Sequence, residues 1–464
     1  MLNKYHKVFV SGIGGIGVSA IARFFLHEGV VVVGSDAMKT VLTEKLVSEG
    51  VTVYYEQKAD NITPDLDLLV YSPAVPEDNP ERVAAVALGI EQKSYPEVLG
   101  ELSLLYDTIA VSGTNGKSTT TAMLSNIMIE AEVDPTVILG SQFPRIGGNF
   151  RYGQSDKFIV EACEYRSHML NLSPRTIVLT NIEEDHLDYF TDINHIVRVF
   201  QEYVSRLNEP GDLNMDSNLL VINNDDFHAQ TLSLPVCRLV TYGIDNKSMV
   251  MAKNICIDHE RQLFDVYRDG VELGRIELHV PGRFNVYNAL AAIATALAYD
   301  ISFLNIQNAF EKYFGIWRRF EKIYDKEIVV ISDYAHHPTA VAATIAAARD
   351  FFPDRRIVTV FQPHQHNRTK NLFEQFVEAL SVADVIVLPE IFEVTGREEL
   401  TDRDVSSHDL VAAILARSPE KEVHYAKDLT KTMETVKKIV RVDDLVLVMG
   451  AGDVYTIADK IGLA

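Results

Sequence analysis

The chain has 464 residues, which is too long for one hydrophobic core, and a typical domain size of about 150 residues predicts roughly three domains. Hydrophobic residues make up 47% and charged residues 23%, so the composition is that of a globular protein and excludes global disorder. The formal net charge of −22 argues against a nucleic-acid-binding protein, because such proteins neutralise phosphates with basic surfaces. Any anionic ligand must therefore be held by local donors.

Two further absences narrow the class of protein. No apolar run reaches the roughly 18 to 20 residues of a membrane-spanning helix, and the glycine-rich start does not suit a signal peptide. The cysteines are Cys163, Cys237 and Cys256, and their wide spacing favours neither a disulfide framework nor a zinc site. We therefore predict a cytoplasmic protein without membrane insertion.

The first region reads as a strand (KVFVSG), a glycine turn, a helix and a second strand (VVVVGSD), which is a βαβ unit. Gly12, Gly14 and Gly17 supply the GxGxxG spacing, and Asp36 ends the second strand. Such a turn lets backbone amides approach a phosphate while the carboxylate accepts from a ribose hydroxyl. A dinucleotide site is the common interpretation, but the same spacing marks tight strand–helix packing, and the nucleotide need not be a dinucleotide.

A second loop follows the strand near residue 108 and precedes an apolar helix. It contains Gly113, Thr114, Asn115, Gly116, Lys117, Ser118 and Thr119. We expect its amides to surround phosphate oxygens, Lys117 to reach the terminal phosphates, and the hydroxyl of Ser118 or Thr119 to bind Mg²⁺. The strict P-loop pattern would need glycine at position 111, where this chain has Val111.

Polar residues follow the next two predicted strands. Glu161 ends one strand, and the segment 181–186 (NIEEDH) ends the other. Because ligands bind at the carboxyl ends of such strands, Glu161 and His186 are candidate magnesium ligands, with exposed loop acids as the alternative. His364 and His366 lack further ligand-type neighbours, so hydrogen-bonding loop residues are the better interpretation there.

The last region begins after FGIWRRFE and again alternates strands (EIVVISDYA, RRIVTVFQP, ADVIVLPEI, DLVLVMGAGDV) with helices. This predicts a parallel, doubly wound sheet. Arg318 and Arg319 stand at the predicted hinge, where a guanidinium could reach a γ-phosphate; a surface arginine pair is the alternative. The predicted fold class is α/β with three domains: a Rossmann-like domain (1–106), a central P-loop ATPase-type domain (107–317) and a C-terminal Rossmann-like domain (318–464).

The whole chain resembles the ATP-dependent Mur ligase family. The family's motifs occur in order as GIGGIG…GSD, GTNGKSTTT, EACEY, TNIEEDHLDYF, PGRFNVYNALAA, WRRFE, DYAHHPTA, FQPHQHNRTK and MGAGDV. Within the family, the chain is most similar to the branch that joins L-alanine to UDP-N-acetylmuramate, through its first glycine loop, DYAHHP and FQPH. The resemblance implies that the lactyl carboxylate attacks the γ-phosphate of ATP and that the amine of L-alanine then displaces phosphate from the acyl phosphate.

The resemblance also implies a role for each site residue. Those for the UDP group of the substrate are Gly14, Gly15, Ile16, Asp36 and Ser72. ATP would be bound by the second loop with Lys117, by Asn288 at the adenine, by Arg319 at the γ-phosphate and by Asp333 at the ribose, and Mg²⁺ by Ser118, Glu161 and His186. The incoming amino acid would be surrounded by Tyr334, His336 and Arg368. The residues implied in catalysis are Lys117, Glu161, His186, Arg319 and His336.

Three departures from that branch keep alternatives open. Asn115 stands where histidine is usual, Gln365 stands where arginine is frequent, and EACEYRSH replaces a more acidic segment. Against the sibling ligases, no lysine occurs from 158 to 246 to serve as their carbamylated lysine, and this absence weighs more than Asn115. A murein tripeptide recycling ligase is the nearest alternative. A dinucleotide-dependent oxidoreductase would leave the second loop unexplained, and a sugar-nucleotide sensor without activity is a third possibility. The sequence leaves the oligomeric state open.

Overall fold

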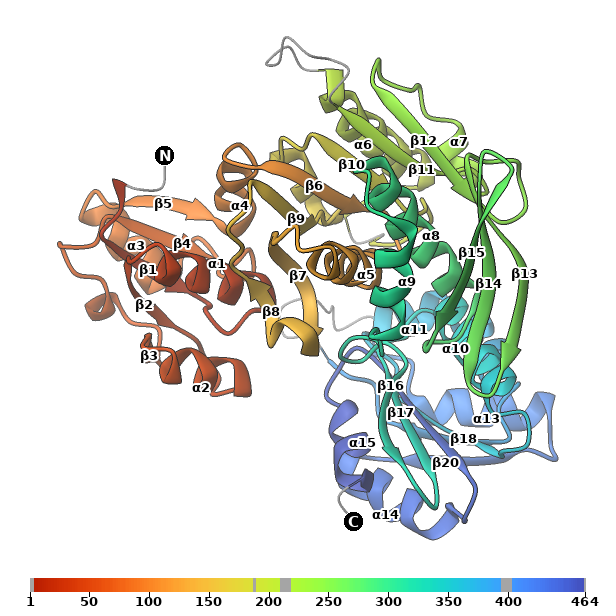
Figure 1. Cartoon of the computed structure of the whole chain (residues 1–464). Helices are drawn as coiled ribbons and strands as arrows, with labels where there is room; N and C mark the ends of the chain where they lie inside the picture. Colours follow the sequence, from red (N-terminus) through yellow and green to blue (C-terminus); the bar gives the residue numbers. More distant parts are fainter. Residues whose placement is uncertain (1–3, 187–188, 209–217, 394–402, 463–464) are drawn as a thin grey trace. The chain divides into compact units, whose positions relative to one another are not determined.

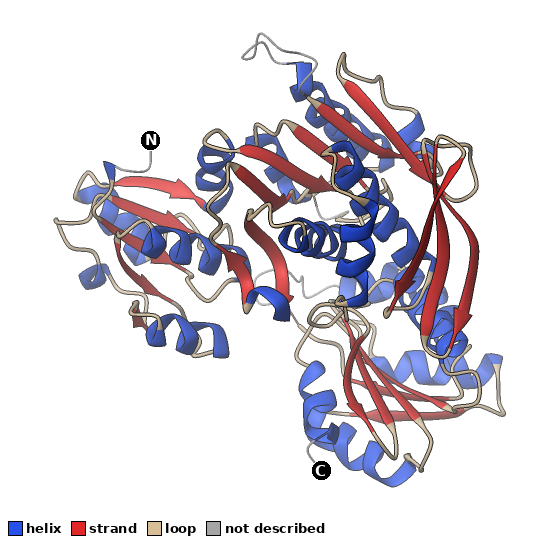
Figure 2. Cartoon of the chain, viewed as in Figure 1, coloured by secondary structure: helices blue, strands red, loops and turns tan. Residues whose placement is uncertain are grey.

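The structure is a computed structural model that describes residues 4–186, 189–208, 218–393 and 403–462. Its strands form three sheets, which have five, ten and six strands in chain order, and most helices connect successive strands along the chain (Figures 1 and 2). The predicted α/β class with three sheet-containing domains is confirmed. Among the described residues, no helix is both long and apolar enough to cross a membrane.

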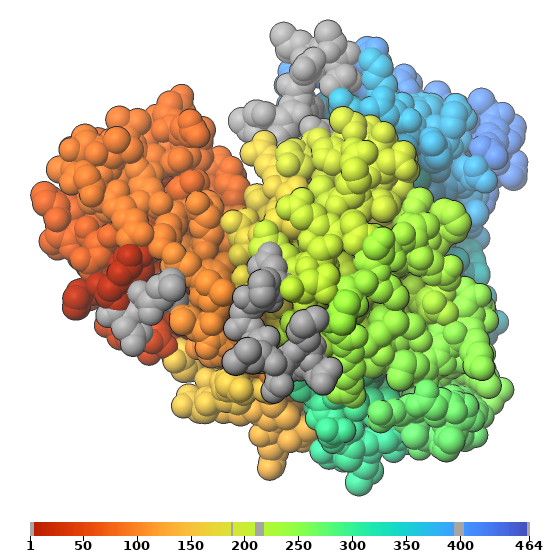
Figure 3. Space-filling model, turned by 90° about the horizontal axis from the view of Figure 1, so that it is seen from above, coloured from red at the N-terminus to blue at the C-terminus, as the bar shows by residue number. Residues whose placement is uncertain are grey.

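The first sheet has the strand order β3-β2-β1-β4-β5 and is parallel throughout. Because the chain passes to β2 on one side of β1 and to β4 on the other, the loop after β1 lies at a topological switch point, where ligands of such sheets bind. In the space-filling view of Figure 3, the residues of this sheet are coloured red to orange and lie together. The elements are β1 (Lys7–Ser11), α1 (Ile16–His27), β2 (Val31–Ser35), α2 (Val41–Ser48), β3 (Thr52–Tyr54), β4 (Leu68–Tyr71), α3 (Pro80–Ala87), β5 (Glu91–Ser94) and α4 (Tyr95–Ser103).

The second sheet has the order β15-β14-β13-β12-β11-β10-β6-β9-β7-β8. Its strand β6 lies between β9 and β10 and is parallel to both, so the ends of these three strands meet at one edge. Helix α5 follows β6 and is buried on every side from Ser118 to Met128, as its lack of a polar face requires. The strands are β6 (Asp107–Ser112), β7 (Thr136–Phe143), β8 (Gly148–Arg151), β9 (Lys157–Glu161), β10 (Thr176–Leu179), β11 (Leu219–Asn223), β12 (Arg238–Gly243), β13 (Val250–Asp258), β14 (Arg261–Arg268) and β15 (Val271–Leu278). The helices are α5 (Lys117–Glu130), α6 (Ile193–Ser205), α7 (Phe227–Gln230), α8 (Arg283–Ala298) and α9 (Phe303–Glu311).

The third sheet has the order β16-β17-β21-β18-β19-β20. Apolar side chains cover both of its faces, which explains why its inner strands are almost wholly apolar in sequence. The predicted parallel arrangement holds except at the edge strand β16, which is antiparallel to β17 because a short hairpin joins the two. The elements are β16 (Glu321–Asp325), β17 (Val329–Asp333), α10 (Pro338–Phe351), β18 (Ile357–Phe361), α11 (His366–Asn371), α12 (Phe373–Leu380), β19 (Val385–Pro389), α13 (Ser407–Arg417), β20 (Glu422–Ala426), α14 (Leu429–Ile439), β21 (Leu445–Met449) and α15 (Tyr455–Gly462).

The chain forms two compact units. One contains 1–253, 265–275 and 286–310, and the other contains 254–264, 276–285 and 311–464. Three sheets therefore divide into two units, with the first and most of the second sheet in the same unit. The domain boundaries predicted near residues 107 and 318 stay a prediction.

Candidate active site

The loop after β6 has a backbone that only glycine fits at two positions. Gly113 has φ of +137° and Gly116 has φ of +82°, both in the left-handed region. A β-carbon at position 113 would overlap Thr180, and one at position 116 would overlap the side-chain oxygen of Asn288. Thr180 and Asn288 therefore lie too close to the backbone of this loop for a side chain at position 113 or 116.

Residues after β10 hold this loop in place. The amide of Thr114 donates to the carbonyl of Asn181 at 2.9 Å, and the amide of Asn115 donates to the Asn181 side-chain oxygen at 2.9 Å. The Asn115 side chain in turn donates to Glu183 at 3.1 Å. These two amides have partners within the protein, so an anion would meet the free amides of the first turn of α5, which begins at Lys117.

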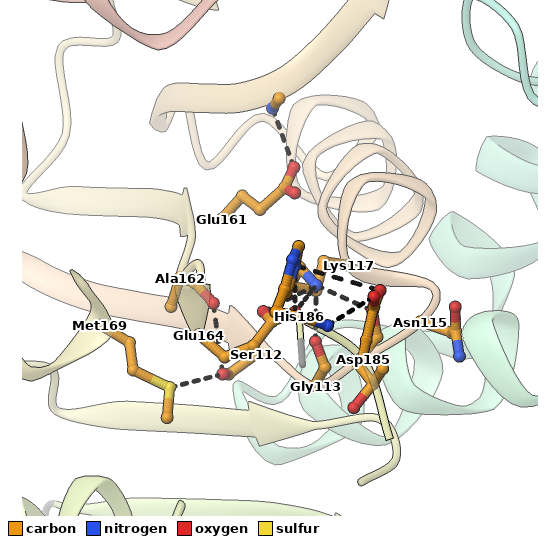
Figure 4. A network of polar contacts seen from close by, with 12 residues as sticks. Ser112, Gly113, Asn115, Lys117, Glu161, Ala162, Glu164, Met169, Asp185 and His186 are labelled. Atoms are coloured by element: carbon orange, nitrogen blue, oxygen red, sulfur yellow. Dashed lines mark hydrogen bonds and ion pairs between the residues drawn. The ribbon is translucent and has the colours of Figure 1, made fainter. Parts of the chain in front are cut away.

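Lys117 forms a buried ion pair with Glu164 (Figure 4). Its ammonium donates to the carbonyls of Gly113 at 2.7 Å and Thr114 at 2.9 Å, and to Oε1 of Glu164 at 3.0 Å. The two side chains are only 13% and 3% exposed. Burial lowers the pKa of Lys117, but the charges of Glu164 and Glu161 and the hydrogen bond to Glu164 together raise that pKa above its ordinary value. Both partners of the pair are therefore charged.

Glu164 was not singled out from the sequence, although it stands in the quoted EACEY motif. Burial alone would raise the pKa of Glu164, but Lys117 and the nearby imidazole of His186 hold it below its ordinary value. The Nε2 atom of His186 lies 3.6 Å from Oε1 of Glu164, and the His186 ring packs 4.7 Å from the ring of Tyr165. One carboxylate thus contacts two predicted site residues.

The three predicted magnesium ligands come from elements that meet at the same edge of the second sheet. Glu161 is the last residue of β9, Ser118 lies in the first turn of α5, and His186 follows β10. Glu161 accepts a hydrogen bond from the amide of Gly140 at 2.8 Å, which orients one of its oxygens away from Lys117 (Figure 4). Within the described ranges, no group of three or more His, Cys, Asp or Glu side chains could hold a metal. Mg²⁺ is usually bound by one or two carboxylates together with phosphate oxygens and water.

Asn288, predicted to contact adenine, lies on α8 and is buried beside Gly116. Its side-chain oxygen accepts a hydrogen bond from Thr120 at 3.3 Å. The structure therefore brings Asn288 to the phosphate-type loop itself, and its contact with adenine stays a prediction.

The predicted UDP-binding residues lie together at the carboxyl edge of the first sheet. The amide of Gly14 donates to Oδ2 of Asp36 at 2.8 Å and the amide of Met38 donates to Oδ1 at 3.0 Å, so that carboxylate supports the glycine loop, and its contact with a ribose stays a prediction. Gly15 caps α1 and Ile16 is its first residue, which gives the helix N-terminus predicted for the diphosphate. Ser72 follows β4 and lies against Gly12.

The residues predicted around the amino acid cluster at the carboxyl edge of the third sheet. The rings of Tyr334 and His336 lie 5.1 Å apart, and His336 lies 6.0 Å from His364. The Arg368 guanidinium approaches Nδ1 of His364 at 3.5 Å, while Arg319 lies over Tyr334 at 4.8 Å. His364 follows the end of β18 by three residues and belongs to this cluster, whereas the sequence pattern predicted only a hydrogen-bonding loop residue there.

Asp333 and Arg318 contact the backbone and the rings next to this cluster. Asp333 accepts from the amides of Phe320 and Ala335, each at 2.7 Å, and burial raises its pKa despite the nearby Arg319. Arg318 is only 4% exposed, donates to the carbonyl of Gly450 and lies 4.9 Å from the Tyr334 ring. The alternative of a surface arginine pair is therefore wrong for Arg318, because this side chain is buried and packs on the ring of Tyr334.

Comparison with known proteins gives a consistent result over the whole length. Three family models match: Mur ligase family, catalytic domain (residues 7–106), Mur ligase middle domain (111–296) and Mur ligase, glutamate ligase domain (318–452). UDP-N-acetylmuramate--L-alanine ligase of Clostridium kluyveri is 40% identical over 98% of this chain and 98% of its own. The enzyme of that name from Clostridium tetani is 40% identical over 99% and 98%.

Solved structures agree. A UDP-N-acetylmuramate-alanine ligase from Thermotoga maritima has a TM-score of 0.82 and 28% identity, with 98% of each chain covered. A murein peptide ligase from Psychrobacter arcticus has a TM-score of 0.71 at 24% identity, covers 99% of this chain and 98% of its own, and shows the shared fold. On these matches, and with the glycine loop, Lys117 and the carboxylates placed as described, this chain belongs to the Mur ligase family.

Proposed function

We propose that this chain is an ATP-dependent ligase that joins L-alanine to the lactyl carboxylate of UDP-N-acetylmuramate through an acyl phosphate. The observation that carries the proposal is the buried Lys117–Glu164 pair at the start of α5, with Glu161 and His186 at the ends of the flanking strands. The names of relatives at 40% identity over nearly the full length support this substrate pair.

The triphosphate would bind at the N-terminus of α5. There the free amides of the first turn meet the phosphate oxygens, and the ammonium of Lys117 exchanges the loop carbonyls for the terminal phosphates. A lactyl carboxylate oxygen attacks the γ-phosphorus, and the bond to ADP breaks. The α-amine of L-alanine then attacks the acyl carbon, the amide bond forms, and inorganic phosphate and a proton leave. Lys117 neutralises the charge that develops on the transferred group.

A magnesium ion fits the donors of this edge when phosphate oxygens complete its shell. We infer that the hydroxyl of Ser118, the free oxygen of Glu161 and the imidazole of His186 would hold it, directly or through water. The ion would supply positive charge to the phosphates.

In the second unit, we assign Arg319 to the γ-phosphate, Asp333 to the ATP ribose, and Tyr334, His336 and Arg368 to the amino acid. The clustering of these side chains at one strand edge supports the assignment. The proposed boundaries 1–106, 107–317 and 318–464 and a cytoplasmic location stay predictions.

The test is the release of phosphate from ATP in the presence of UDP-N-acetylmuramate. L-alanine, glycine, L-serine and the tripeptide of murein are added in separate reactions, and the product is identified by mass. We expect release to depend on L-alanine. Dependence on the tripeptide alone would make the chain a recycling ligase, and release that depends on none of these amines would contradict both assignments. Saturable binding of NADH would favour the oxidoreductase alternative.

A further inference from the structure

Tyr95 is held rigidly at the carboxyl edge of the first sheet. It is the first residue of α4 and directly follows β5. A capping box fixes this helix start: the amide of Ser94 donates to Glu97 at 2.7 Å, and the amide of Glu97 donates back to the Ser94 hydroxyl at 3.4 Å. Pro96 restricts the backbone of the residue before it, which is Tyr95. The backbone of Tyr95 therefore has little freedom to move its side chain.

The phenol of Tyr95 lies against the first turn of α1. A β-carbon at position 17 would lie 2.6 Å from Cζ of Tyr95 and 2.9 Å from its hydroxyl oxygen. Gly17 is thus needed for the ring to approach, and the hydroxyl stands beside the helix N-terminus that begins with Gly15 and Ile16. This is the place where we assign the diphosphate of the substrate.

The hydroxyl has no hydrogen bond within the described residues. Tyr95 is partly buried and its hydroxyl stays accessible, so an acceptor on a bound ligand can reach it. Burial raises the pKa of Tyr95, and the charge of Glu161, the last residue of β9, raises it further. The phenol is therefore a neutral donor that lies between the glycine loop and the edge that carries Glu161.

We propose that the Tyr95 hydroxyl donates a hydrogen bond to an anionic oxygen of the nucleotide-sugar substrate and so aligns it on α1. The inference rests on the proposed function. The acceptor is either a diphosphate oxygen or an oxygen of the lactyl carboxylate. Both groups are anionic, and we assign the diphosphate to the glycine loop and the carboxylate to the edge that carries Glu161.

The test is calorimetric titration of Tyr95→Phe with UDP, with UDP-N-acetylmuramate and with ATP. The variant keeps the ring that packs on Gly17 and loses only the donor. A hydrogen bond to a charged group predicts a Kd about tenfold to a hundredfold weaker for the nucleotide sugar. Weaker binding of UDP as well identifies the diphosphate as acceptor, and weaker binding of the nucleotide sugar alone identifies the carboxylate. The Kd for ATP and the melting temperature should not change.

Tyr5→Phe is the matched control. Tyr5 precedes β1 and so lies at the amino ends of the strands, away from the carboxyl edge that carries Tyr95. Its hydroxyl donates to Glu91 at 3.1 Å. Tyr5→Phe therefore removes a hydrogen bond from the fold but should leave nucleotide binding unchanged. An unchanged Kd in Tyr95→Phe, with normal binding by the wild type, would overturn the role of Tyr95 alone. Failure of the wild type to bind either uridine nucleotide would overturn the proposed function and this inference together.

Discussion

Removal of the Lys117 ammonium should affect stability as well as catalysis. Lys117→Ala should abolish turnover, because it removes the charge that we assign to the terminal phosphates. In the structure, Lys117 also neutralises Glu164, which is 3% exposed, so the substitution leaves a buried carboxylate without its partner. Loss of one member of a buried pair typically costs about 3 to 5 kcal/mol. Total stabilities are about 5 to 15 kcal/mol, so a clear fall in melting temperature is expected.

The pH dependence gives this prediction a sign. In the wild type the pKa of Glu164 is depressed, so the pair stabilises the fold above the carboxyl's unfolded pKa, and this contribution is lost as the pH falls through the folded pKa. In Lys117→Ala only the histidine contact opposes burial, and we expect the folded pKa of Glu164 to rise above its unfolded value. The variant should then be closest to the wild type in stability at acidic pH and furthest from it at neutral pH.

A double-substitution cycle separates the two effects. Lys117→Ala/Glu164→Ala removes both charges and should recover much of the stability at neutral pH while ligation stays absent. Calorimetric melting of the four proteins from pH 4 to 8, with phosphate release as the activity assay, measures both quantities. The reasoning is refuted if Lys117→Ala melts like the wild type at pH 7, or if the double variant is no more stable than the single one.

Three further substitutions test other parts of the site. Gly116→Ala should weaken ATP binding at least about tenfold, because the left-handed backbone and Asn288 leave no room for a methyl group; titration with ATP measures this, and an unchanged Kd would contradict the loop geometry. Glu161→Gln should raise the Mg²⁺ concentration needed for half-maximal activity, with the melting temperature in the absence of ATP as control; equal Mg²⁺ curves would remove Glu161 from the metal site. Arg318→Ala should raise the KM for L-alanine by loosening Tyr334, whereas the KM for UDP-N-acetylmuramate should stay the same, and a uniform loss of all activity without that split would argue for a general folding defect.

Local patterns in the sequence were sufficient to predict the fold class and the phosphate-type loop. A strand, a glycine turn and a helix are neighbours along the chain, so the GTNGKST segment predicts Lys117 at a helix N-terminus without knowledge of the rest of the molecule. The alternation of apolar strands and helices likewise predicts parallel sheets, whose strand ends then bring Glu161 and His186 to one edge.

Contacts between distant residues were decided only by the tertiary structure. Glu164 pairs with Lys117 across 47 positions, and Arg318 contacts Gly450 across 132. Such pairings depend on how strands are ordered in a sheet and on which side chains lose water, and neither quantity is local in sequence. For the same reason the sequence could not assign Tyr95, because its approach to Gly17 exists only after β5 takes its place beside β4 and brings α4 against α1.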